Sequence, residues 1–205
     1  MGDFKQLIAM KKVGLTGNIG SGKTTVCKIF ETIEVPVFYA DLVGQALLKE
    51  PDVAGIIAQQ FGKAVLDSDA GVNRAALASI VFKDKESLRR LNQIIHPLVW
   101  EKFAQWASAL GDFHYVIQEA AILFETGFNK NFDKVIVVSA PESLRIQRVM
   151  ERDNVSESDV LARGANQFPQ TLLEEKADFI IINDGKTAVL PQVLEIDARL
   201  RNCTN

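Results

Sequence analysis

A glycine-rich segment near the N-terminus has the residue types and the spacing to bind a polyphosphate. Gly17-Asn18-Ile19-Gly20-Ser21-Gly22-Lys23-Thr24 fills every position of the pattern G-x-x-x-x-G-K-[ST], the Walker A loop. Glycines let successive backbone N–H groups turn inward around an anion, and a helix that begins near Lys23 adds its positive end. Lys23 is expected to reach the β- and γ-phosphates of a nucleotide, and the Thr24 hydroxyl to ligate Mg²⁺. A plain glycine-rich turn before a helix is the alternative interpretation.

Two acidic residues stand where strands are expected to end, at the sheet edge that binds ligands in open α/β folds. Asp41 could accept the proton of an attacking hydroxyl in phosphoryl transfer, or could simply cap a helix that begins near Leu42. Glu119 could hold a water of the Mg²⁺ shell, because magnesium takes few protein ligands, or could be a structural acid.

Arginines recur on one expected helix. Arg145, Arg148 and Arg152 are spaced i, i+3 and i+7 and therefore share a helix face. One interpretation is a lid that closes on ATP, in which Arg148 and Arg152 clamp phosphate oxygens and Arg163 joins them from the next helix. The other is a solvated helix laced with salt bridges.

An α/β fold is predicted to position these groups. The runs rich in β-branched or aromatic residues are Lys12–Thr16, Val35–Tyr39, His114–Glu119, Lys134–Ser139 and Asp178–Ile182. The helix-like stretches between them include Lys23–Ile33, Leu88–Leu110, Pro141–Arg152 and Thr187–Leu200. Such alternation is typical of a doubly wound parallel sheet with helices on both faces.

One connection is too long for an ordinary crossover, since about 75 residues separate the second and third expected strands where a dozen or so suffice. We therefore expect a single domain over residues 1–205 with a helical insert at 42–110 and a lid at 141–170. The core would be formed by residues 11–41, 111–140 and 171–205.

Composition narrows the class of protein. The chain has 205 residues, 47% of them hydrophobic and 24% charged, which is the balance of an ordinary globular domain. A net charge of -3 argues against nucleic acid as a partner, and no apolar run approaches a membrane span. The segment from Met1 to Met10 does not resemble a targeting peptide, and either methionine could be the natural start. With only two cysteines, we expect a protein of the reducing cytoplasm. We also expect a monomer or a small homo-oligomer.

From residue 13 to about 185 the chain resembles the dephospho-coenzyme A kinases. Beyond the loop, the similar segments are Val72-Asn73-Arg74-Ala75-Ala76-Leu77, Val81-Phe82, Leu91 to Pro97 with its His-Pro pair, Gln147-Arg148, Arg152-Asp153, Arg163, Gln167, and Ala177-Asp178 through Asn183-Asp184-Gly185. Two segments depart from the family: Tyr39-Ala40-Asp41 stands where it has Asp-Ala-Asp, and Glu119 begins a segment that starts with Asp and contains proline there.

The resemblance implies a P-loop NTPase fold with a five-stranded parallel sheet. It also implies phosphorylation of the 3′-hydroxyl of dephospho-CoA by ATP with Mg²⁺, which yields coenzyme A and ADP. The catalytic residues would be Lys23, Asp41 and Arg148. ATP would contact Gly17, Asn18, Ile19, Gly20, Ser21, Gly22, Lys23, Thr24, Thr25, Arg148, Arg152, Arg163 and Asn183. The acceptor would contact Asp41, Asn73, Arg74, His96 and Glu119, although Asn73 and Arg74 could equally be surface residues and His96 a packed histidine.

Two other functions remain open on these residues. A nucleoside or shikimate type of P-loop kinase would share the loop and the arginine lid. A GTP-dependent switch is less favoured: Asp41-Leu42-Val43-Gly44 matches D-x-x-G, but Asn129-Lys130-Asn131-Phe132-Asp133 has one residue too many for N-K-x-D.

Overall fold

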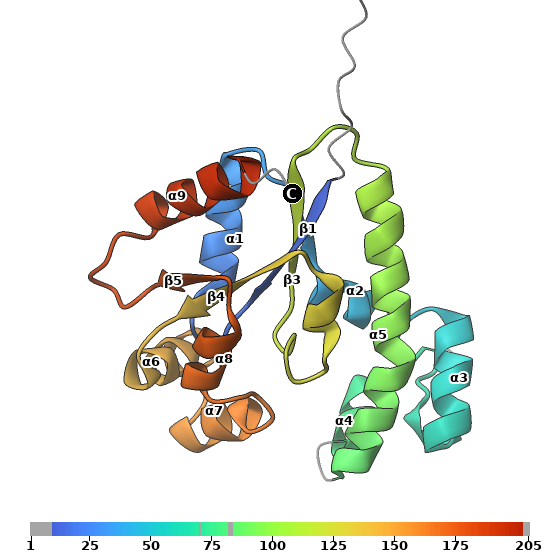
Figure 1. The fold of residues 1–205 in the computed structure, drawn as a ribbon. Helices are drawn as coiled ribbons and strands as arrows, with labels where there is room; N and C mark the ends of the chain where they lie inside the picture. Colours follow the sequence, from blue (N-terminus) through green and yellow to red (C-terminus); the bar gives the residue numbers. More distant parts are fainter. Residues whose placement is uncertain (1–9, 70, 82–83, 203–205) are drawn as a thin grey trace, which may run out of the picture. The chain divides into compact units, whose positions relative to one another are not determined.

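The structure is a computed structural model that describes residues 10–69, 71–81 and 84–202 (Figure 1). By its internal contacts the chain divides into two compact units. One comprises Met1–Phe38 and Leu110–Asn205, and the other comprises Tyr39–Ala109. The expected Val81-Phe82 segment lies partly outside the described residues, because these end at Val81 before resuming at Asp84.

A five-stranded sheet forms the centre of the first unit, as the sequence predicts. Its strands follow the order β2-β3-β1-β4-β5, so consecutive strands are separated by crossovers. The pairs β1·β3, β1·β4 and β4·β5 are all parallel. The strands are β1 (Lys11–Thr16), β2 (Val37–Tyr39), β3 (Tyr115–Glu119), β4 (Lys134–Ser139) and β5 (Phe179–Ile182). Because β1 is central, the loop that follows it lies at the middle of the carboxyl edge.

Helices cover the sheet, and its central strands are therefore buried almost throughout. Val13, Leu15 and Ile136, for example, are fully buried. Helix α1 contacts α9, α9 contacts β5, and α8 contacts β4 (Figure 1). The helices of this unit are α1 (Lys23–Thr32), η2 (Phe128–Asn131), α6 (Glu142–Asp153), α7 (Glu157–Gly164), α8 (Gln170–Lys176) and α9 (Val189–Asn202). None of the helices in the described residues is long and apolar enough to cross a membrane.

The second unit is helical. Its longest element, α5, contacts both α2 and α4, and its core includes Leu47, Ile57 and Phe103. Phe103 also packs between the rings of Trp100 and Trp106, with centroids 5.3 and 5.9 Å away. The elements are α2 (Ala40–Leu47), α3 (Pro51–Phe61), η1 (Lys63–Val65), α4 (Arg74–Val81) and α5 (Lys85–Ser108).

Element boundaries differ from the expected ones for local reasons. Strand β2 begins at Val37, since the Val35 N–H returns to the Phe30 carbonyl at the end of α1, at 3.1 Å. Helix α5 begins three residues before Leu88, because the Asp84 carboxylate accepts bonds from the Glu86 and Ser87 amides and caps the helix there. Helix α9 starts after Thr187, whose N–H is held in a turn by Asp184 at 2.7 Å.

Candidate active site

The glycine-rich loop follows β1 and leads into α1, as its pattern requires. Gly20 and Gly22 have φ of +78° and +95°, which side chains rarely adopt. A Cβ atom at Gly20 would overlap the carbonyl of Arg145, and one at Gly22 would overlap the Asn183 amide nitrogen. Glycine at both positions therefore permits α6 and the segment after β5 to approach the loop.

Groups suited to a polyphosphate gather at the start of α1. Gly22 is the N-cap residue and has no side chain that could cap the helix. Lys23, Thr24 and Thr25 form the first turn. The Lys23 ammonium donates to the Gly17 carbonyl at 2.9 Å, so it is folded over the loop. The buried Ser21 hydroxyl has no hydrogen-bond partner among the described residues. The loop thus presents a helix end, a cation and hydroxyl groups at one place.

Arg148 lies against this loop. Its guanidinium donates to the Gly20 carbonyl at 3.5 Å and to Asn183 Oδ1 at 3.4 Å. Asn183 in turn donates from Nδ2 to the Ser21 carbonyl at 2.8 Å. The structure thus brings together the loop, Arg148 and Asn183, all of which are expected at ATP.

Arg152 and Arg163 converge instead on one carboxylate. Arg152 Nε and Arg163 Nη1 each donate to Asp153 at 2.7 Å. Hydrogen bonds from Arg152 and then from Arg163, with their charges, hold the pKa of Asp153 below its ordinary value, and the bond to Asp153 raises the pKa of Arg152. One ionised acid therefore holds Arg152 and Arg163 side by side.

Glu119 ends β3 as expected and is buried, with 7% of its surface exposed. Burial is the largest cause that raises the pKa of the Cys27 thiol, and the negative charge of Glu119 raises it further, whereas the positive charge of Lys23 lowers it. Glu119 and Lys23 therefore both act electrostatically on the first turns of α1. Thr24 precedes Cys27 by three residues and shares its helix face.

Asp41 is not the helix cap. Helix α2 begins at Ala40 with Tyr39 at the cap position, and Asp41 lies in the first turn with an exposed side chain. The capping interpretation was wrong because the helix starts earlier than the sequence predicts. The D-x-x-G match, Asp41 to Gly44, lies wholly inside this helix and forms no switch loop.

The residues of the second unit that are expected at the acceptor differ in their surroundings. The Asn73 side-chain carbonyl caps α4 by accepting from the Ala75 and Ala76 amides, both at 3.1 Å. Arg74 is the exposed first residue of α4. His96 is half-buried before Pro97 in α5, and burial lowers its pKa. The neutral imidazole is thus favoured.

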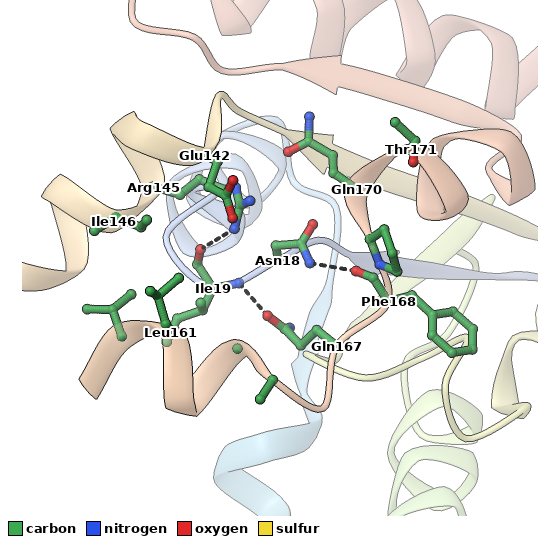
Figure 2. A pocket seen from close by; sticks show the side chains of 14 residues that line it. Asn18, Ile19, Glu142, Arg145, Ile146, Leu161, Gln167, Phe168, Gln170 and Thr171 are labelled. Carbon is green, nitrogen blue, oxygen red and sulfur yellow. Dashed lines mark hydrogen bonds between the residues drawn. The ribbon is translucent and has the colours of Figure 1, made fainter. Parts of the chain in front are cut away.

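A pocket of about 540 Å³ adjoins the loop (Figure 2). Asn18 and Ile19 line it from the loop, Arg145 from α6, Leu161 from α7, and Gln167 and Phe168 from the segment after α7. Arg145 Nη1 donates to the Ile19 carbonyl at 3.4 Å, and burial lowers the pKa of Arg145. Sequence reasoning assigned no role to Arg145, Gln167 or Phe168, although the resemblance includes Gln167.

Comparisons with known proteins identify the family of the chain. The family model for dephospho-CoA kinase matches residues 11–188. A dephospho-CoA kinase of Salinibacter ruber is 42% identical over 179 residues, which cover 86% of this chain and 90% of the relative. The crystal structure of TT1252 from Thermus thermophilus matches with a TM-score of 0.81 at 30% identity, covering 96% of this chain and 99% of that one.

The dephospho-CoA kinase of Campylobacter jejuni has a TM-score of 0.64 at 27% identity, covering 93% of this chain and 96% of that one. The expected P-loop fold is therefore confirmed. Because the family model matches residues 11–188 and the Salinibacter ruber relative is 42% identical over most of both chains, the chain belongs to the dephospho-CoA kinase family.

Proposed function

We propose that this protein transfers the γ-phosphoryl group of ATP to the 3′-hydroxyl of dephospho-CoA, giving coenzyme A and ADP. The observation that carries the proposal is the complete phosphate loop, Gly17–Thr24, at the end of the central strand β1, in a chain of this family. An ATP-using kinase needs little covalent chemistry from the protein, because positioning and charge stabilisation supply most of the rate.

On this proposal the loop amides and the N-terminal end of α1 bind the β- and γ-phosphates. Lys23 moves from the Gly17 carbonyl to the transferring phosphoryl group and stabilises its charge. Arg148 is already at the loop edge, where its guanidinium can bind a phosphate oxygen with two parallel hydrogen bonds. Residues 141–170 act as the lid, and Arg152 and Arg163 exchange Asp153 for the nucleotide.

Asp41 is proposed to accept the proton of the acceptor hydroxyl. It lies two residues after the end of β2, in the first turn of α2, and its side chain is exposed. Residues 42–110 supply the acceptor-binding part, with Arg74 pairing with a phosphate and Asn73 and His96 lining the pocket for the acceptor.

The oxygen donors near α1 fit Mg²⁺ bound with ATP. The described residues contain no cluster of three His, Cys, Asp or Glu side chains, so a protein cage for a metal is absent from them. Thr24 would ligate the ion and Glu119, at the end of β3, would hold one of its waters, since magnesium keeps several waters and takes few protein ligands. When bound, the ion neutralises charge that develops on the phosphate oxygens.

We also propose a cytoplasmic location, and that the protein acts as a monomer or small homo-oligomer. The free thiol of Cys27, buried in the fold, is compatible with a reducing compartment.

The deciding experiment offers the purified protein, with ATP and Mg²⁺, four kinds of acceptor: dephospho-CoA, adenosine, shikimate and nucleoside monophosphates. Release of ADP and the mass of the phosphorylated product are followed together. Formation of coenzyme A from dephospho-CoA, with no phosphorylated product from the other acceptors, supports the proposal. Faster turnover of shikimate or a nucleoside would instead assign the protein to another class of small-molecule kinase.

A further inference from the structure

Two consecutive residues, Gln167 and Phe168, are joined by four hydrogen bonds to two loops that are far apart in the sequence. The phosphate loop is Gly17–Thr24, and the segment of residues 120–127 after β3 is called the post-β3 loop. On the phosphate loop, the Ile19 N–H donates to Gln167 Oε1 at 2.7 Å and Asn18 Nδ2 donates to the Phe168 carbonyl at 2.9 Å. Figure 2 shows both bonds.

The other two bonds reach the post-β3 loop. Gln167 Nε2 donates to the Ala121 carbonyl at 2.8 Å, and the Phe168 N–H donates to Glu125 Oε1 at 2.8 Å. Phe168 also packs against a buried cluster that includes Leu123 and Phe124 of the same loop. We call Gln167 and Phe168 the dipeptide bridge.

On the phosphate-loop side, the bridge fixes one peptide plane. The N–H of the Asn18–Ile19 peptide is held by Gln167, and its carbonyl accepts from the Ser21 N–H at 3.1 Å. Because a peptide unit is planar and rigid, bonds at both ends set its orientation. The turn that aims the following loop amides is thereby held in place from outside.

On the other side, the bridge holds the backbone two residues after Glu119. The Ala120 N–H continues the sheet by donating to the Leu15 carbonyl at 3.0 Å, and Ala121 is the first residue beyond it. A displacement of the Ala121 carbonyl would therefore pass directly to the end of β3, where Glu119 lies.

A side-chain amide is the group that this position requires. Gln167 accepts on one side and donates on the other, and a reversed amide would place two donors together at Ile19 and two acceptors together at Ala121. A glutamate carboxylate could still accept from the Ile19 N–H but could not donate to the Ala121 carbonyl, and a methionine of similar length could make neither bond.

We infer that Gln167 is a positioning residue for phosphoryl transfer, which sets the phosphate loop in register with the Glu119 end of β3. The inference rests on the proposed function, since it assigns ATP to the phosphate loop on one side of the bridge and a magnesium-bound water to Glu119 on the other. It assigns Gln167 no contact with either substrate.

The test compares Gln167→Met with the parent and with Gln105→Met. Gln105 is exposed on α5 and donates to Glu101 at 3.2 Å, so this control makes the same substitution away from the bridge. The turnover of dephospho-CoA and the melting temperature are measured for each of the three proteins. Hydrogen–deuterium exchange of peptides that cover residues 17–24 and 120–127 is measured with and without a non-hydrolysable imido analogue of ATP.

We expect kcat of Gln167→Met to fall about 10- to 100-fold, the effect of displacing reacting groups by up to an ångström, with little change in melting temperature. In the parent and in Gln105→Met, the analogue should slow exchange in both segments. In Gln167→Met it should slow exchange only in residues 17–24.

Three outcomes would overturn the inference: kcat within threefold of the parent, slowed exchange of residues 120–127 persisting in Gln167→Met, or no such slowing in the parent. If Gln167→Met does not fold, Gln167→Glu keeps the acceptor for Ile19 and decides the same question at residues 120–127. A parent that binds the analogue but does not phosphorylate dephospho-CoA would refute the proposed function alone, because the exchange measurement needs no acceptor.

Discussion

Replacing Asp41 by asparagine separates a role in catalysis from a role in the fold. The structural loss is small, because Asp41 lies in the first turn of α2 and does not cap it. Loss of one charge near a helix N-terminus is worth about 0.3–1 kcal/mol, or a few degrees in melting temperature for a chain of this size. Loss of a positioned proton acceptor should lower kcat by about 10²- to 10⁴-fold, or about 2.7–5.4 kcal/mol in the barrier.

The assay measures kcat at saturating ATP and dephospho-CoA, the KM for ATP, and thermal unfolding. Asp52→Asn is the matched control, because Asp52 is an exposed acid in the first turn of α3. Both variants should lose the same small amount of stability, and only Asp41→Asn should lose turnover. Turnover of Asp41→Asn within threefold of the parent would remove Asp41 from the reaction and make Glu119 the acid to test.

Three further outcomes are expected. Lys23→Ala should lower kcat by about 10²-fold or more with the fold intact, since the ammonium lies over the loop and not in the core; near-normal turnover of the folded variant would contradict the loop assignment. Arg148→Lys should raise the KM for ATP or lower kcat by about tenfold or more, because an ammonium cannot reproduce a two-pronged contact, and unchanged constants would make this arginine a surface charge. Burial and the Glu119 charge raise the pKa of Cys27, so iodoacetamide at pH 8 should leave its peptide unmodified in the native protein and modify it in urea, as mass spectrometry would show. Rapid native modification would mean that this part of α1 opens readily.

The sheet was predictable because its strands carry a strong local signal. Buried β-branched runs such as Lys134–Ser139 are matched to the residue, and the loop pattern fixes the join between β1 and α1. Errors occurred where one hydrogen bond decides a boundary. The start of α5 depends on the Asp84 cap, and the start of α2 at Ala40 is marked by no capping side chain, which is why Asp41 was misplaced as a possible cap.

The site was predictable only in part. The loop, Arg148 and Asn183 follow motifs, and the structure brings them together. The bridge residues are joined to Asn18, Ile19 and Ala121 by bonds between positions 150, 148 and 46 residues apart. No periodicity or spacing in the sequence encodes such contacts, because they depend on where the fold places backbone groups.

If Arg152 and Arg163 bind ATP as proposed, their ion pairs with Asp153 affect how the ATP affinity responds to salt. Arginines that meet a triphosphate directly from water give a binding constant that falls steeply as ionic strength rises. Here the nucleotide must displace an existing carboxylate, whose lowered pKa keeps it ionised at neutral pH. Salt weakens the pairs on both sides of this exchange, so the number of ion pairs changes little on binding. On this proposal, the part of the ATP affinity that Arg152 and Arg163 supply should vary little with salt concentration.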